Sequence, residues 1–281
     1  MGTYEYLVAD VFTATPLEGN PVAVFIDARG ISSATMQRIA NELHLSETVF
    51  VLPPDHDGDV RVRIFTPVNE LQFAGHPTLG AAIVLNEPLS GSKLRMETGM
   101  GTIPFEFCRG NQTGAVFAWM RQPVPTWEPY ESTSELLEAL GLSESTLPVE
   151  VYRNGPRHVF VGLESVEALT AIDPDQRVLA RLPDMAANCF AKASDGWRLR
   201  MFSPAYGVAE DAATGSAAGS LAVHLARHSR ICFGDQIGIV QGVEIGRLST
   251  MHARVSGTVE HIEDVRVGGS AVIVAKGVLR L

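Results

Sequence analysis

The sequence is poor in cysteine and has no long apolar run. Its 281 residues include three cysteines, Cys108, Cys189 and Cys232, with no C-x-x-C spacing. A disulfide framework or a thiolate zinc site is therefore not expected, and the thiols are predicted to be small buried side chains in a reducing compartment. No apolar run reaches the roughly 18 residues of a membrane span, and the first residues lack the features of a signal peptide. These absences predict a cytoplasmic protein with no membrane partner.

Positive charge is also scarce. The 22 Lys and Arg against 32 Asp and Glu give a formal net charge of −10. This charge argues against nucleic acid as a partner, because nucleic-acid binding requires a basic face. Hydrophobic residues make up 46% and charged residues 19% of the chain, which is enough apolar material for a packed core and excludes a disordered or coiled-coil composition.

One sequence pattern occurs twice, about half the chain length apart. Residues 60–67 and 197–204 both end in R-x-R, an apolar residue, Phe, Thr or Ser, and Pro. Glu70 and Glu210 follow, each five residues before a glycine that opens a small-residue stretch. The repeat predicts two related domains, at residues 1–128 and 129–281, with the last strand able to return to the first domain. Chance similarity is the alternative.

Short strands are predicted for most of the chain. Residues 61–65 alternate polar and apolar side chains, as a half-buried strand does. Further strands are expected at 6–12, 21–26, 48–52, 102–107, 115–120, 158–162 and 271–275, and helices after Ser32 and around Leu136. The proline-rich residues 122–129 are expected to be a linker.

Residues 75–85 and 215–226 are predicted to be two helices that are apolar nearly all round and rich in Ala and Gly. A helix of this kind should be buried on every side, which indicates a barrel-like sheet wrapped around each one. Each begins at a glycine, where N–H groups lack partners within the helix and the helix dipole favours an anion. If the halves face each other, both starts converge on one cleft for a carboxylate. The alternative is that the glycines only permit tight turns.

Several longer strings resemble the PhzF family. They are GNPVAVF at 19–25, LSET at 45–48, FTP at 65–67, FAGHP at 73–77, QPVPTW at 122–127, NGPRHVFVGL at 154–163, EDAATGSA at 210–217 and QGVEIGR at 241–247. The resemblance covers essentially the whole chain. It implies an α+β, diaminopimelate-epimerase-like fold of two pseudo-symmetric domains, each a barrel-like, mostly antiparallel sheet around a central helix, with the active site between them.

The resemblance also implies an activity. Members isomerise trans-2,3-dihydro-3-hydroxyanthranilate to the aminoketone precursor of phenazines, without metal or organic cofactor, as homodimers. Two other interpretations stay open: an isomerase or epimerase of the same fold that acts on another small carboxylate, and a non-catalytic protein that binds a small acid. The presence of Glu47, His76 and Asp211, which can transfer protons, favours an enzyme over a protein that only binds a small acid.

Six residues are candidates for the site. Diaminopimelate epimerase places two cysteines before the glycines of the helix starts, but here Ala74 and Thr214 stand there, which excludes a two-thiol mechanism. The resemblance implies that Glu47 moves a proton from C3 to C1 of the ring. It also implies that His76 hydrogen-bonds the substrate as a neutral imidazole and that Asp211 orients its polar groups. The N–H groups of three residues at the helix starts are predicted to hold the substrate carboxylate: Gly75, Gly215 and Ser216.

Other polar residues receive structural interpretations. Glu70 and Glu210 are expected to bind the R-x-R strands. His224 and His228 have the i,i+4 spacing of a zinc pair, but no third ligand is evident, so a polar helix end is favoured and no metal site is predicted. His158 is interpreted as a satisfied core or strand-end histidine.

Overall fold

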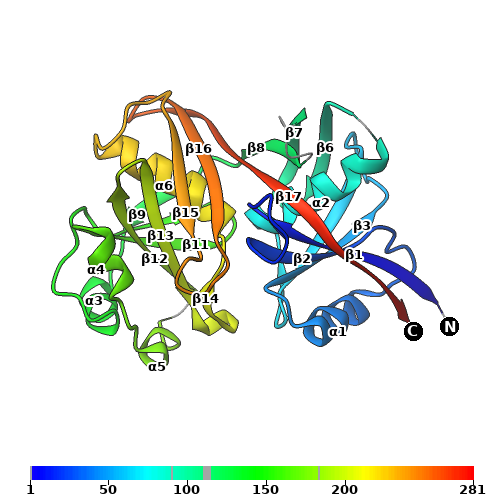
Figure 1. The fold of residues 1–281 in the computed structure, drawn as a ribbon, viewed down its shortest axis with the longest axis horizontal. Coiled ribbons are helices and arrows are strands. Elements are labelled where there is room, and N and C mark those ends of the chain that lie inside the picture. Colours follow the sequence, from blue (N-terminus) through cyan, green and yellow to red (C-terminus); the bar gives the residue numbers. More distant parts are fainter. Residues whose placement is uncertain (1, 90, 110–114, 183) are drawn as a thin grey trace. The chain divides into compact units, whose positions relative to one another are not determined.

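A computed structural model describes residues 2–89, 91–109, 115–182 and 184–281. The chain forms two compact units, one made of Met1–Arg121 with Gly268–Leu281 and the other of Gln122–Val267. The last strand, β17 (Ile262–Arg280), therefore begins in the second unit and ends in the first. In the first unit it runs antiparallel to β1 (Thr3–Val11), and the two chain ends lie side by side (Figure 1).

The sheet of the first unit closes into a barrel of eight strands. Its strands, besides β1 and β17, are β2 (Asn20–Phe25), β3 (Glu47–Leu52), β4 (Val60–Phe65), β6 (Lys93–Thr98), β7 (Gly101–Arg109) and β8 (Val116–Gln122). They pair in chain order, and β17 closes the barrel between β8 and β1. The β2–β3 and β4–β6 pairs are parallel, whereas β1–β2, β1–β17, β3–β4, β6–β7 and β7–β8 are antiparallel. The short β5 (Glu70–Leu71) pairs with the end of β4.

Helix α2 (Gly75–Leu89) lies inside this barrel. Residues 75–84 are all buried, and the helix packs against β1, β2, β3 and β6. Its small side chains are what allows this fit. Gly80 is the tightest point, because a Cβ there would lie 2.6 Å from Cγ2 of Val11 and 2.7 Å from Cγ1 of Val22. Helix α1 (Ser33–Leu43) packs on Phe25, Phe50 and their neighbours in a separate apolar cluster.

The second unit repeats this order of elements. Its strands are β9 (Thr126–Pro129), β10 (Glu150–Arg153), β11 (Arg157–Leu163), β12 (Ala186–Ala193), β13 (Gly196–Ser203), β14 (Val208–Asp211), β15 (Gln236–Gln241) and β16 (Ser249–Gly257). The parallel pairs are β11–β12 and β13–β15, at the places that correspond to β2–β3 and β4–β6. This correspondence of ladders confirms the predicted pseudo-symmetric α+β fold.

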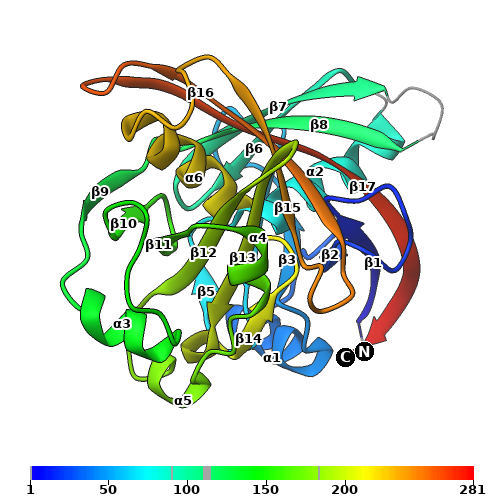
Figure 2. The same cartoon turned by 60° about the vertical axis from the view of Figure 1, so that its left-hand side comes forward.

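Helix α6 (Gly215–Arg227) is the counterpart of α2, and residues 215–226 are all buried. The helix packs against β16 and β11. On the other face of the sheet, α4 (Val166–Thr170) packs on β11, β12 and β13, near α3 (Thr133–Ala139) and α5 (Gln176–Leu179) (Figure 2). A 3₁₀ turn at Pro204–Tyr206 precedes β14. No helix among the described residues is long and apolar enough to cross a membrane.

Two expectations from the sequence are wrong. Thr126–Pro129 is not a linker but the strand β9, paired antiparallel with β10. Its Trp127 ring stacks on Tyr152, with ring centroids 6.1 Å apart, so apolar burial outweighs the flanking prolines. The thiols of Cys108 and Cys232 are exposed, and only Cys189 is buried. Cys108 lies on the outward-facing side of the alternating strand β7, and Cys232 lies in the loop after α6.

Gly80→Ala tests the tight fit of α2. The added methyl group should lower the free energy of unfolding by about 1–3 kcal/mol, because the neighbouring Val11 and Val22 must move. In an open helix the same change would raise stability by up to about 1 kcal/mol. Urea unfolding measures the sign. Gly238→Ala is the control, since the nearest atom to its Cβ is 3.9 Å away. A stabilised Gly80→Ala protein would contradict the packing.

Candidate active site

Glu47 and His76 lie together in the first unit. Helix α1 ends at Leu43, and the left-handed conformation of the next residue, His44 (φ 52°), turns the chain toward β3. Glu47 is the first residue of that strand. His76 is the second residue of α2. Its Nε2 atom is 3.4 Å from Oε2 of Glu47, and the two side chains are 4% and 15% exposed. A carboxylate that is largely shielded from solvent therefore lies beside a buried imidazole at the start of a helix.

Burial keeps His76 uncharged. Loss of solvent lowers its pKa from 6.5 to about 3, and a backbone hydrogen bond with Pro21 opposes this only in part. The other ring nitrogen, Nδ1, is 3.3 Å from Nδ2 of Asn20, which is itself buried. His76 is thus a neutral ring with both nitrogens next to polar groups. Asn20 was not among the residues predicted for the site, although it lies in one of the family-like strings.

In the second unit, Asp211 and the start of α6 lie together. Asp211 ends β14, and α6 begins at Gly215 after the turn that contains Thr214. The hydroxyl of Thr214 donates a hydrogen bond of 2.6 Å to Oδ2 of Asp211. Gln241, at the end of β15, accepts a hydrogen bond from the Thr214 N–H at 3.0 Å. Gln241 was not among the residues predicted for the site.

Ser216 is held by a histidine. Nε2 of His158 is 2.9 Å from Oγ of Ser216, and Nδ1 is 3.4 Å from the side-chain amide of Asn188. Burial lowers the pKa of His158 to about 3, so this ring is also neutral. His158 is satisfied at the start of β11, as the sequence analysis interpreted it, but its contact with Ser216 could not be read from the sequence.

Two buried side-chain amides bind backbone carbonyl groups in the first turn of α6. Gln122 donates to the carbonyl of Gly215 at 3.0 Å, and Asn154 donates to the carbonyl of Ser216 at 3.1 Å. The N–H groups of a first helical turn have no partner within the helix and carry the positive end of its dipole. Held in this way, the start of α6 is a rigid place for an anion.

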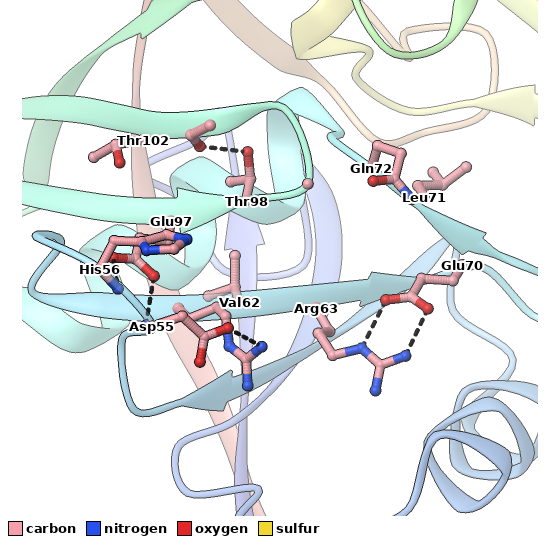
Figure 3. A pocket seen from close by; sticks show the side chains of 13 residues that line it. Asp55, His56, Val62, Arg63, Glu70, Leu71, Gln72, Glu97, Thr98 and Thr102 are labelled. Atoms are coloured by element: carbon pink, nitrogen blue, oxygen red, sulfur yellow. Dashed lines mark hydrogen bonds and ion pairs between the residues drawn. The ribbon is translucent and has the colours of Figure 1, made fainter.

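The R-x-R strands are stabilised as predicted. Arg63 binds Glu70 at 2.6 Å in the first unit, and Arg200 binds Glu210 at 2.8 Å in the second. The first pair lines a cavity of about 290 Å³ (Figure 3), where Arg61 also pairs with Asp55 at 2.5 Å. Neither Glu47 nor His76 lines this cavity. Both arginines of the cavity are paired with carboxylates, and Glu97 accepts hydrogen bonds from backbone N–H groups, which supports a structural interpretation.

The structure supplies a third group beside His224 and His228, which the sequence did not reveal. Oε2 of Glu150 is 3.3 Å from Nδ1 of His224 and 3.0 Å from Nε2 of His228, so the three could surround a metal ion. Arg227, however, already binds the same oxygen at 2.7 Å and lies over the Trp127 ring. Burial would raise the pKa of Glu150, but its hydrogen bonds outweigh this and lower it. With an arginine already present, the cluster is a buried ion-pair network.

The fold and the two helix starts define a diaminopimelate-epimerase-like protein. A hydroxyproline epimerase from Agrobacterium vitis has this fold, with a TM-score of 0.65 at 12% identity, covering 99% of this chain and 91% of that one. A phenazine biosynthesis protein of the PhzF family from Bacillus anthracis has a TM-score of 0.88 at 27% identity, with all of both chains covered.

The model of the PhzC-PhzF family, described as phenazine biosynthesis-like protein, matches residues 9–277. The chain belongs to this family. The trans-2,3-dihydro-3-hydroxyanthranilate isomerase of Pseudomonas aeruginosa is 59% identical over 275 residues, which cover 98% of each chain.

The buried histidines predict how stability depends on pH. In the unfolded chain the pKa of His158 is near the ordinary histidine value of 6.5, whereas burial lowers this pKa to about 3 in the folded protein. Between these values the unfolded state binds more protons, so the free energy of unfolding falls with falling pH by about 1.4 kcal/mol per pH unit for this group. Urea unfolding between pH 6.5 and pH 4 measures the slope.

His158→Gln should flatten that slope by the same amount. His261→Gln, at an exposed histidine, is the control and should leave the slope as it is. If the His158→Gln protein loses stability with falling pH as steeply as the native protein, His158 is not a buried neutral histidine.

Proposed function

We propose that this protein is an isomerase that converts trans-2,3-dihydro-3-hydroxyanthranilate to the aminoketone precursor of phenazines. The observation that carries the proposal is the pairing of Glu47 with the buried, neutral His76 at the start of α2. The 59% identity over 98% of the chain to a relative named for this reaction supports the choice of substrate. The reaction moves protons and rearranges double bonds within one molecule, so it needs no oxidant or reductant.

Glu47 is the base and then the acid in this proposal. Its carboxylate removes the proton from C3 of the ring, the double bonds shift, and the resulting glutamic acid returns a proton to C1. The enol at C3 then becomes the ketone as its hydroxyl proton is replaced by a proton on carbon. Substrate and product are isomers, and the carboxylate is regenerated. A carboxylate that is largely shielded from water is suited to this role, because desolvation makes it a stronger base.

The other residues bind and orient the substrate. The neutral His76 ring hydrogen-bonds the hydroxyl or amino group of the substrate without adding charge. Its Nε2 atom also holds the Glu47 carboxylate in place between the two proton transfers. Asp211 orients the substrate's polar groups. The N–H groups of Gly75, Gly215 and Ser216 hold the substrate carboxylate and stabilise negative charge as it develops.

The proposal includes a homodimeric, cytoplasmic protein. The family resemblance supports the dimer, and the exposed free thiols of Cys108 and Cys232 fit a reducing compartment. Light scattering on the purified protein should give twice the mass of one chain. A mass of one chain at micromolar concentration would contradict the dimer and leave the proposed reaction untouched.

Glu47→Gln tests the role of the base. The amide has nearly the same shape as the carboxylate but cannot accept the proton from carbon. We therefore expect kcat to fall by about 10²–10⁴-fold or more. The measurement is the rate of substrate loss, followed by chromatography. Glu42→Gln, on the exposed side of α1, is the matched control and should keep native activity. Native activity in Glu47→Gln would remove this residue from the mechanism, and an inactive native protein would contradict the proposed substrate.

A further inference from the structure

The turn between β14 and α6 contains a closed set of buried polar groups. Asp211, Thr214 and Gln241 are 5%, 7% and 0% exposed. Besides the two hydrogen bonds described above, the Nε2 atom of Gln241 donates to the Asp211 carbonyl at 2.9 Å and to Oγ1 of Thr214 at 3.0 Å. Gln241 thus binds the turn at three points, and Thr214 stands between Gln241 and the carboxyl group of Asp211.

The backbone fixes the direction of these hydrogen bonds. A backbone N–H can only donate and a backbone carbonyl can only accept. Because the N–H of Thr214 binds Gln241 on one side and the carbonyl of Asp211 binds it on the other, the amide of Gln241 has one allowed orientation. Its NH₂ group then donates to the hydroxyl of Thr214. The single proton of that hydroxyl is therefore directed to Oδ2 of Asp211.

The first unit shows that the fold does not require this set. In the matching ladders, Leu71 pairs with Ile64 as Asp211 pairs with Met201. Ala74 precedes Gly75 as Thr214 precedes Gly215. The position that corresponds to Gln241 on β15 is Thr98 on β6, whose hydroxyl binds the carbonyl of Gly101 instead. The first unit therefore closes the same turn without a buried carboxyl group, and burying three polar groups costs free energy unless every one is satisfied.

We infer that Thr214 and Gln241 are positioning residues for Asp211 in the isomerase reaction. They hold Oδ2 of Asp211 as a hydrogen-bond acceptor, so any proton that Asp211 carries or transfers is on Oδ1. This inference rests on the proposed function, in which Asp211 orients the substrate. It assigns a new role to the position at which two-base epimerases carry a cysteine.

Thr214→Val and Gln241→Glu test the inference. Valine has the shape of threonine without the hydroxyl. The glutamate has no N–H to donate and accepts the Thr214 proton itself, which draws that proton away from Asp211. Each change should lower kcat by about 10- to 100-fold with KM changed by less than about twofold, because the reacting geometry is lost and not the bulk of substrate binding. The acidic limb of the pH–rate profile should move to higher pH, since a hydrogen bond to the ionised carboxylate is lost.

Three comparisons separate positioning from a structural role. Thr214→Ser keeps the hydroxyl and should restore most of kcat. The double variant Thr214→Val/Gln241→Glu should be no slower than either single variant, because both act through one hydrogen bond. Thr170→Val is the matched control, since it removes a threonine hydroxyl that donates to the carboxylate of Glu244 at 3.2 Å in the same unit, and it should leave kcat unchanged.

A measurement without turnover keeps the inference distinct from the proposed function. Carbon-13 NMR of labelled aspartate follows the titration of the Asp211 carboxyl group in the native and Thr214→Val proteins. The midpoint should move to higher pH in the variant. An unchanged midpoint, native kcat in Thr214→Val, or failure of serine to restore kcat would each overturn the inference. If the native protein is inactive but the titration midpoint of Asp211 shifts in the Thr214→Val protein, the proposed function is contradicted and the positioning of Asp211 is still supported.

Discussion

The narrow space inside each sheet is the constraint on which the rest of the structure depends. A helix enclosed on all sides by strands has room only for small side chains along much of its length. This requirement is met by Gly and Ala in α2 and by Gly, Ala and Ser in α6. At Gly80 even a methyl group would meet Val11 and Val22. The same enclosure fixes where each helix begins, so His76 and Ser216 come to lie at equivalent points of two equivalent turns.

Enclosure also sets the charge of the groups at these turns. Burial makes the charged form of an imidazole costly, and both His76 and His158 stay neutral for this reason. Two duplicated frames have thus acquired different chemistry. The first unit places a carboxylate beside a neutral histidine. The second unit places a hydroxyl group beside a neutral histidine, and its buried carboxyl group accepts a hydrogen bond from a threonine hydroxyl to which a glutamine amide donates. The frame is conserved between the units, whereas the polar groups differ.

Much of the frame could be predicted from the sequence, because it depends on local pattern. The repeat of the R-x-R segments predicted two similar units, and the small-residue stretches predicted the two buried helices. The pairing of Glu70 and Glu210 with their arginines also followed from matched positions. The linker prediction was wrong at Thr126–Pro129, because prolines occur in both linkers and edge strands. The packing of Trp127 on Tyr152 decides between the two only in three dimensions.

The polar partners could not be predicted in this way. Gln241 reaches Thr214, and His158 reaches Ser216, through the register of distant strands, and a buried Gln, Asn or His looks in sequence like a surface residue. The third group beside His224 and His228 was missed for the same reason, since Glu150 is on another strand. Glu47 and His76 were found through the family resemblance, and the structure adds that they touch.

In the proposed reaction this chain moves a proton between two carbons of one small ring. Proton NMR of the native protein with trans-2,3-dihydro-3-hydroxyanthranilate in D₂O tests it most directly. The proposed reaction predicts loss of the C3 proton signal, hydrogen or deuterium at C1, and deuterium at the ring carbon that is protonated when the enol becomes the ketone. An unchanged spectrum in the presence of folded protein would contradict the assigned substrate. Loss of substrate to a product that still carries the original C3 proton would contradict removal of that proton by Glu47.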